Sequence, residues 1–201
     1  MFIIFLKKIL MSKKIAIFAS GKGTNTEKIC SFFSSSHDTE VSLLCSNKKS
    51  SGIFKLAKKH NLNSYLLEKP TKNSFYLLSL FLKKEKIDYI VLAGFLLKVP
   101  LFIIKDYPNK IINIHPSLLP KFGGKGMYGK NVHKAVIKNK EKISGVTVHY
   151  VNENYDDGAI IYQHVYSLKK NETYATLAVE IQKIEHHHYP LIIEGVIKKE
   201  F

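Results

Sequence analysis

The stretch IDYIVLAGF, residues 87–95, is a nearly unbroken run of apolar side chains with β-branched residues near its centre. Such a run is typical of a strand in the middle of a parallel sheet, where helices cover both faces. Segments with helical spacing separate it from shorter apolar runs at 15–20, 41–46, 64–68 and 111–116. This alternation predicts an α/β domain of three layers, with a mostly parallel sheet and helices on both faces.

The C-terminal part of the chain follows a different pattern. Two β-branched runs, at 145–151 and 159–168, are joined by a loop too short to contain a crossover helix. Strands connected in this way pair antiparallel, so we expect a mixed sheet. A long helix is expected from about residue 174.

The first ten residues, MFIIFLKKIL, are apolar but too few to span a bilayer, which takes about 20 residues. They also lack the basic leader and the cleavage site of a secretory signal. We therefore expect residues 1–12 to be a frayed extension or a misassigned start, residues 13–201 to form one domain, and the protein to be cytoplasmic. Cys30 and Cys45 have no metal or redox spacing, which fits a reducing compartment and core packing.

The net charge is +15, and all 31 basic residues are lysine. A basic chain suggests nucleic-acid binding, but such recognition relies mostly on arginine, whose planar group makes paired contacts. The lysines here are scattered along the chain, so compositional drift explains the charge better. We expect small-molecule partners rather than nucleic acid or membrane, and a diffuse positive field that attracts anionic substrates.

The segment SGKGTN, residues 20–25, directly follows the first strand and opens the first helix. Free backbone N–H groups and the positive end of the helix dipole favour a phosphate at such a position. Thr24 and Asn25 can also cap the helix. Thr26 occupies the place of the third glycine of a dinucleotide fingerprint, which argues against NAD. Two interpretations remain: a site for a single phosphate, or a plain glycine turn before a helix.

Asn113 and His115 lie two residues apart on the strand at 111–116, so their side chains share one face. Pro116 ends the strand, which places both near its carboxyl edge, where ligands collect in open α/β sheets. An amide beside an imidazole can hold a carbonyl oxygen as it gains negative charge, and can transfer a proton. The alternative is a pair that only satisfies backbone groups, although the glycine-rich run that follows weakens this interpretation.

Asp156 and Asp157 lie in the loop NENYDDGA between the last two expected strands. A carboxylate there could orient the imidazole and stabilise its protonated form. An aspartate before a glycine is also a common turn residue. Spacing alone does not separate the two aspartates.

Segments along nearly the whole chain from Lys13 carry a family resemblance: FASGKGTN, SNK at 46–48, VLAGFLLKVP, INIHPSLLPKFGGKGMYG, GVTVHYVNENYDDGAII and IQKIEHHHYP. The sequence resembles the single-domain glycinamide ribonucleotide formyltransferases. The run NIHPSLLP followed by D-x-G is highly specific to transferases that use 10-formyltetrahydrofolate. The resemblance implies a Rossmann-like formyltransferase fold, with 10-formyltetrahydrofolate as co-substrate and no metal.

The resemblance also implies roles for individual residues. Asn113 and His115 correspond to the catalytic pair, and Asp156 to the catalytic carboxylate. The residues implied to hold the substrate phosphate are Gly23, Thr24 and Asn25. Those implied to lie near the ribose and the substrate amine are Gln182 and Glu185. Those implied to bind the folate, largely through backbone groups, are Leu96, Leu97, Lys98, Val99, Asn113, Val151 and Asn152.

Several positions depart from the family pattern. Leu97 stands where some relatives carry arginine, and Ala159 replaces a proline that usually follows D-x-G. The GGKGMYG insert matches only one branch of the family. His186 matches the family motif, but His187 and His188 do not; consecutive helical residues diverge by about 100°, so the three cannot chelate one ion together.

The expected reaction is attack of the amine of 5′-phosphoribosylglycinamide on the formyl carbon of 10-formyltetrahydrofolate, a step of purine (IMP) synthesis. Asn113 and a protonated His115 would hold the oxyanion, and Asp156 would favour that protonated form. Alternatives are a formyltetrahydrofolate hydrolase, which normally has an N-terminal regulatory domain, a tRNA formyltransferase, which has a further C-terminal domain, and a sugar formyltransferase. A basic nucleic-acid-binding module is the alternative outside enzymes. Either a monomer or a homodimer is compatible with the sequence.

Overall fold

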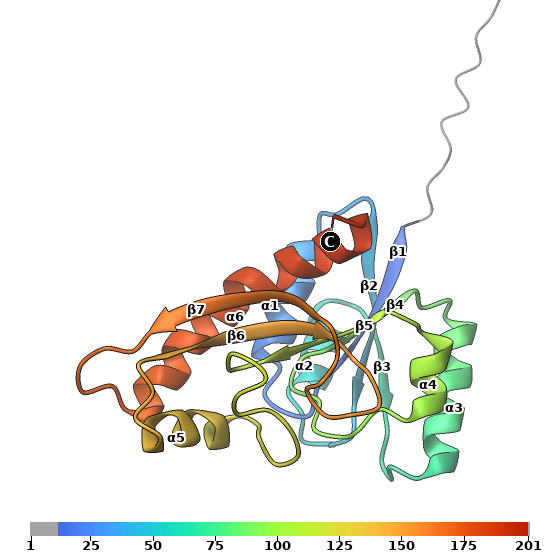
Figure 1. Cartoon of the computed structure of the whole chain (residues 1–201). Helices are drawn as coiled ribbons and strands as arrows, with labels where there is room; N and C mark the ends of the chain where they lie inside the picture. Colours follow the sequence, from blue (N-terminus) through green and yellow to red (C-terminus); the bar gives the residue numbers. More distant parts are fainter. Residues whose placement is uncertain (1–11, 201) are drawn as a thin grey trace, which may run out of the picture.

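The computed structural model describes residues 12–200, so the expected N-terminal extension lies outside it except for Ser12. The described residues form a sheet of seven strands in the order β3-β2-β1-β4-β5-β6-β7 (Figure 1). The strands are β1 (Lys13–Phe18), β2 (Thr39–Ser46), β3 (Asn63–Leu66), β4 (Tyr89–Leu92), β5 (Ile111–His115), β6 (Ile143–Tyr150) and β7 (Ile160–Ser167). The first five pair parallel, whereas β6 pairs antiparallel with both β5 and β7. The predicted α/β class and mixed sheet are confirmed.

Strand β4 is central, as its apolar sequence predicts, but it is shorter than residues 87–95. It pairs with β1 on one side and β5 on the other, and all four of its residues are buried. The ladder ends after Leu92, and the chain turns at Gly94, whose φ of 77° lies in the left-handed region that favours glycine. The segment 96–99, which contains residues expected to bind the folate, follows this turn.

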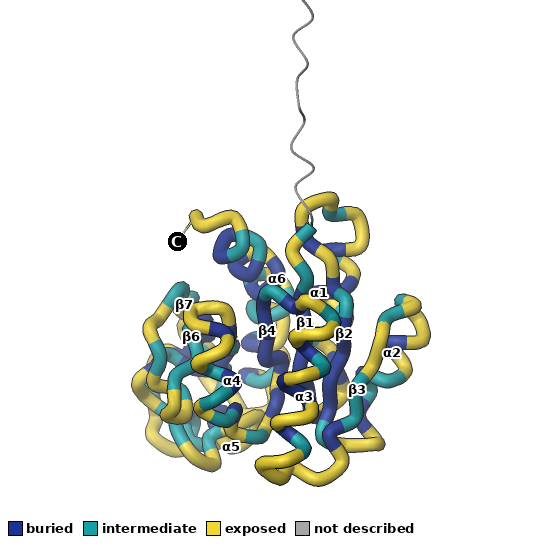
Figure 2. The backbone as a smooth tube through the Cα atoms, turned by 90° about the vertical axis from the view of Figure 1, so that its right-hand side faces the viewer, coloured by how far each residue is buried: buried dark blue, intermediate teal, exposed yellow. Residues whose placement is uncertain are grey.

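Helices cover both faces of the sheet (Figures 1 and 2). They are α1 (Thr24–Phe33), α2 (Ile53–Lys59), α3 (Lys72–Lys84), α4 (Leu101–Asp106), α5 (Lys130–Lys138) and α6 (Tyr174–Lys198). Alternate residues of β1 enter two separate cores: Ile15 and Ile17 pack with α1, α2 and α6, and Ala16 and Phe18 pack with α3 and α4. This alternation is the direct reason for the three layers.

Helix α6 is anchored to the sheet close to the expected catalytic strand. The buried hydroxyl of Tyr189 lies 3.0 Å from the carbonyl oxygen of Leu92 and 3.1 Å from that of Ile112, so its hydrogen can be donated to either of them. Leu92 is the last residue of β4, and Ile112 lies on β5 directly before Asn113. None of the helices within residues 12–200 is long and apolar enough to cross a membrane.

The two cysteines lie in the core, as expected. Cys30 is 4% exposed and Cys45 is fully buried, and neither forms a disulfide. Burial raises the pKa of the Cys30 thiol to about 12, and that of Cys45 rises as well. Both thiols are therefore protonated and unreactive at neutral pH.

Candidate active site

Asn113 and His115 lie on the same face of β5, the face that α3 and α4 cover further down the sheet. Leu92, the last residue of β4, pairs with Asn113, so both side chains sit where the parallel strands end. On the other side, β6 brings His149 opposite Asn113 and Thr147 opposite His115. The site is thus built on the junction between the parallel and the antiparallel halves of the sheet.

His149 is a residue of the site that the sequence analysis missed. It is only 2% exposed, and its Nδ1 lies 2.7 Å from the carbonyl oxygen of Tyr150, which can only accept a hydrogen bond. The hydrogen is therefore on Nδ1, and Nε2 accepts from Asn113 Nδ2 at 3.0 Å. The alternation in GVTVHYV predicts its face, but only the register between β5 and β6 reveals that it faces Asn113.

The structure separates the two aspartates of the loop before β7. The Asp156 carboxylate points inward: Oδ2 accepts from the Gly124 N–H at 2.9 Å and lies 3.4 Å from His115 Nδ1, while Oδ1 is 3.4 Å from Asn113 Nδ2. Asp157 accepts instead from the side chains of Asn152 and Asn154 on the surface. Asp156 adopts a left-handed backbone with φ of 53°, a conformation that aspartate tolerates better than most residues.

Opposing effects act on the charges of this site. Burial raises the pKa of Asp156, but the His149 and His115 rings in their protonated forms and the Gly124 N–H outweigh it, so the pKa lies below the usual value of 3.8. Burial lowers the pKa of His115, and the neighbouring Asp156 offsets this only in part. In the protein without substrates, the carboxylate is therefore charged and the imidazole is mainly neutral at pH 7. The expected protonated His115 concerns the ring while it holds the oxyanion, and it stays a prediction.

The loop after β5 covers His115. Its Nε2 lies 2.8 Å from the carbonyl oxygen of Phe122 and donates to it, and the residue is only 3% exposed. Phe122 has a φ of 57°, and Gly124 and Gly126 also have positive φ, so the chain bends sharply over the imidazole. A substrate oxygen can reach Nε2 only if the Phe122 carbonyl moves away.

Thr147 holds the start of this loop. Its hydroxyl donates to the carbonyl of Ser117 at 2.6 Å and accepts from the Leu119 N–H at 3.0 Å. Gln163 on β7 donates to the same hydroxyl at 2.9 Å and to the Leu119 carbonyl at 3.0 Å. Because Thr147 is fully buried, this network fixes the first residues of the loop relative to His115.

The expected phosphate loop and the residues expected from α6 are brought together. The helix begins after Gly23, which has a φ of 81° and no side chain to cap it, so the predicted capping by Thr24 and Asn25 is wrong. Thr24 Oγ1 instead accepts from Gln182 Nε2 at 3.1 Å, and Asn25 Nδ2 donates to Glu185 Oε2 at 2.8 Å. These side chains face α6 rather than their own helix.

Two groups in this part of the site are chemically unusual. Burial raises the pKa of Glu185 to about 7, with the Asn25 amide opposing the change. The Oδ1 atom of Asn25 is buried and has no hydrogen-bond partner within residues 12–200. The Asn25 Oδ1 atom and the Glu185 carboxyl group are both shielded from water, so they can accept hydrogen bonds from a polar ligand that enters here.

Most of the residues expected to contact the folate lie in two segments, called here the two walls. The first wall is the 96–99 segment, and the second is the loop after β6. In the first wall, the Leu96 N–H donates to Ser20 Oγ at 3.0 Å, and Ser20 Oγ donates to Asn47 Oδ1 at 2.6 Å. This places the 96–99 segment beside the expected phosphate loop. Within the segment, Leu96 is exposed, Leu97 is half-buried, and the Val99 side chain is in the core.

The second wall is the loop after β6. The Val151 N–H donates to the Ile111 carbonyl at 3.0 Å, and the Asn152 side chain bonds within the loop. Lys98 bridges the walls, with its Nζ 5.9 Å from the centre of the Tyr155 ring.

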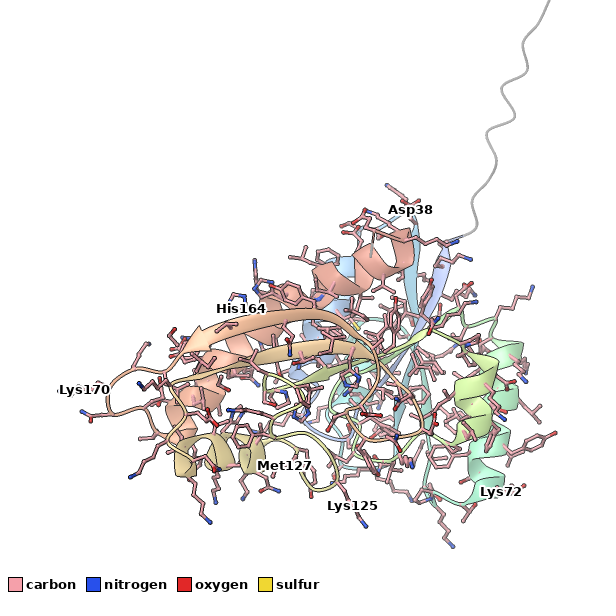
Figure 3. All side chains as sticks on the ribbon, in the orientation of Figure 1. Asp38, Lys72, Lys125, Met127, His164 and Lys170 are labelled. Atoms are coloured by element: carbon pink, nitrogen blue, oxygen red, sulfur yellow. The ribbon has the colours of Figure 1, made fainter. Side chains whose placement is uncertain are left out.

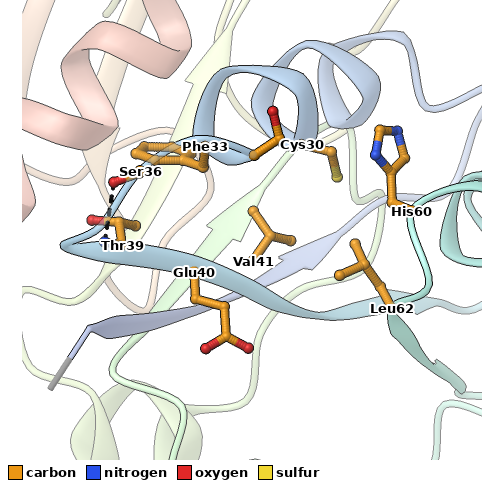
Figure 4. Close-up of a pocket in the computed structure, with 9 residues that line it drawn as sticks. Cys30, Phe33, Ser36, Thr39, Glu40, Val41, His60 and Leu62 are labelled. Atoms are coloured by element: carbon orange, nitrogen blue, oxygen red, sulfur yellow. Dashed lines mark hydrogen bonds between the residues drawn. The ribbon is translucent and has the colours of Figure 1, made fainter.

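A pocket of about 280 Å³ lies away from this site (Figure 4). Cys30, Glu40, Val41 and His60 are among its lining residues, and β2 begins there, so it opens at the amino ends of the strands. It shares no residue with the site around Asn113. Within residues 12–200, no three His, Cys, Asp or Glu side chains gather so that they could hold a metal ion.

An amide, an imidazole and a carboxylate at the carboxyl edge of an open α/β sheet can stabilise charge and move a proton during transfer at a carbonyl carbon. Residues 13–193 match the family described as Formyl transferase. The chain belongs to this family, whose members use a formyl folate as co-substrate.

Similarity to individual proteins narrows the assignment to the phosphoribosylglycinamide formyltransferases. The one from Bacillus subtilis (strain 168) is 33% identical over 190 residues, which cover 92% of this chain and 95% of that protein. The crystal structure of the one from Bacillus halodurans has a TM-score of 0.85 and 35% identity, covering 94% of this chain and 97% of that one.

The chloroplastic protein of Arabidopsis thaliana is 37% identical over 195 residues, or 93% of this chain. The chain spans 66% of the length of that protein and 62% of the length of the Vigna unguiculata one.

Proposed function

We propose that this protein transfers the formyl group of 10-formyltetrahydrofolate to the amine of 5′-phosphoribosylglycinamide, a step of purine synthesis. The observation that carries the proposal is the convergence of Asn113, His115 and Asp156 at the end of β5, with one carboxylate facing both other side chains. The relatives named phosphoribosylglycinamide formyltransferase support the choice of substrates.

The proposed reaction begins when the amine nitrogen attacks the formyl carbon and forms a tetrahedral oxyanion. Asn113 Nδ2–H and His115 Nε2–H donate to this oxygen, once the Phe122 carbonyl has released the imidazole. The bond between the formyl carbon and the folate nitrogen then breaks, and the proton lost by the amine ends on that nitrogen. The Asp156 carboxylate orients His115 and stabilises any positive charge that the ring gains.

Substrate binding is proposed to use the residues around α6 and the two loop walls. The N–H groups of Thr24 and Asn25 and the start of α1 would hold the phosphate, with Gly23 allowing close approach. Gln182 and Glu185 would face the ribose and the glycinamide amine, and the 96–99 and 151–152 segments would hold the folate. We further propose a reducing compartment such as the cytoplasm, because both cysteines are free.

The test is a steady-state assay with both substrates, in which the folate product is followed by absorbance. Transfer predicts that folate is released only when the ribonucleotide is present. Equal release without the ribonucleotide would identify a hydrolase instead, and no release with either substrate set would reject the whole assignment.

A further inference from the structure

A cluster of histidines lies outside the proposed active site, between α6 and β7. His164 on β7 and His188 on α6 have ring centroids 4.6 Å apart, and their planes differ by 35°. His187 packs against His188 with centroids 4.8 Å apart. Figure 3 labels His164 on β7, beside α6. The cluster therefore joins β7 to α6, the helix that follows it in the chain.

The Nδ1 atoms of the two stacked histidines approach one oxygen. The Tyr162 hydroxyl, two residues before His164 on the same face of β7, is 3.1 Å from His188 Nδ1 and 3.4 Å from His164 Nδ1. A phenol has a single hydrogen, so it can donate to only one of these nitrogens. Two imidazole nitrogens and one hydroxyl oxygen therefore lie close together. Such a group can share one hydrogen, and it can also bind a cation.

We propose that His164 and His188 bind a divalent late transition metal such as Zn²⁺ through their Nδ1 atoms. Imidazole is a preferred ligand for Zn²⁺, Cu²⁺ and Ni²⁺, with nitrogen–metal distances of about 2.0–2.1 Å for zinc. The Tyr162 hydroxyl or water completes the coordination. Both Nδ1 atoms already lie within 3.4 Å of one oxygen atom, so rotations of these side chains can bring them to one ion.

Binding of a metal by imidazole depends on pH. A neutral ring offers a nitrogen lone pair, whereas an imidazolium cannot ligate a metal. Metal binding should therefore release protons and weaken as the pH falls below about 6.5.

This site departs from our expectation that the chain binds no metal. The argument against chelation by His186, His187 and His188 together is unaffected, because the proposed pair comes from two different elements. The bound ion would link α6 to β7 and stabilise this part of the fold. Gln182, which is proposed to bind substrate, lies less than two turns before His188 on α6.

The test uses the full chain freed of metal and titrated with Zn²⁺ by calorimetry. Single-site binding is expected for the wild-type protein, with at least about tenfold weaker affinity in both His164→Gln and His188→Gln. The matched control is His37→Gln, because His37 is an exposed histidine between α1 and β2. Its affinity should equal that of the wild type.

A second measurement keeps the proposal testable if the variants fail to fold. One equivalent of Zn²⁺ should shift the ring-nitrogen resonances of His164 and His188 in the wild-type protein, and leave those of His115 and His149 in place. Absence of binding, unchanged affinity in both variants, or shifts confined to the active-site histidines would each overturn the proposal.

Discussion

Asn113 and His149 face each other across the ladder between β5 and β6, and the Asn113 amide donates to His149 Nε2 over 3.0 Å. His149 can only accept at this atom, because its other nitrogen donates to the Tyr150 carbonyl. The amide orientation of Asn113 is therefore fixed. Its second N–H makes only a long contact of 3.4 Å with Asp156, which leaves a donor for a substrate oxygen.

His149 should act as a positioning residue. Replacing it by leucine removes the acceptor, so we expect kcat to fall by about ten- to a hundredfold with little change in the KM for the ribonucleotide. His149→Gln restores an acceptor and should recover part of kcat. Steady-state kinetics of both variants, beside His37→Leu as a surface control, test this. Equal rates for the leucine and glutamine variants would contradict the role.

The three proposed catalytic side chains should each matter for turnover. We expect Asn113→Ala, His115→Ala and Asp156→Asn to lower kcat by on the order of a hundredfold or more, because each loses charge stabilisation in the transition state. Asp157→Asn is the matched control and should keep near-wild-type turnover, since Asp157 bonds only to surface asparagines. If the two aspartate variants behaved alike, the choice of Asp156 would be wrong.

Thr147 should affect both stability and turnover through the loop over His115. Thr147→Val leaves the Leu119 N–H buried without its acceptor, which costs about 1–3 kcal/mol in the free energy of unfolding. Thr147→Ser keeps the hydroxyl and should lose much less. Urea unfolding and kcat are measured on both. A valine variant as stable and as active as the serine variant would exclude this network from positioning the loop.

The raised pKa of Glu185 predicts that the stability difference between the wild type and Glu185→Gln depends on pH. Its pKa is about 7 in the folded protein, against 4.5 ordinarily, so the folded state holds the proton more tightly than the unfolded state does. The wild type should therefore lose stability as the pH rises from 4.5 through 7, relative to Glu185→Gln. At about 1.4 kcal/mol per pKa unit, the variant gains up to about 3 kcal/mol above pH 7 and nothing below pH 4.5. A pH-independent difference in unfolding free energy would contradict the shifted pKa.

Much of the fold follows from local patterns in the sequence. The apolar run around Ile90 predicts a central strand, and the short link before β7 predicts an antiparallel pair. The strand ends earlier than its apolar run because Gly94 turns the chain, which is a backbone choice that hydrophobicity does not reveal.

Local sequence patterns predict which residues of the site lie together only where these residues belong to the same strand or helix. Asn113 and His115 are two apart on one strand, so their common face follows from strand geometry. His149 requires the register between two strands, and the cover over His115 requires the path of a loop. Thr24 was expected to cap its own helix, but its partner is Gln182, 158 residues later, which no local pattern reveals.

The central claim is that the formyl group moves from the folate to the amine of the ribonucleotide. Incubation with 10-formyltetrahydrofolate carrying a ¹³C formyl group, followed by mass spectrometry of the ribonucleotide, tests it most directly. We predict labelled formylglycinamide ribonucleotide in amounts equal to the tetrahydrofolate released, and on the order of a hundredfold less of it with Asn113→Ala over the same time. Label recovered as formate, with the ribonucleotide unchanged, would contradict the claim.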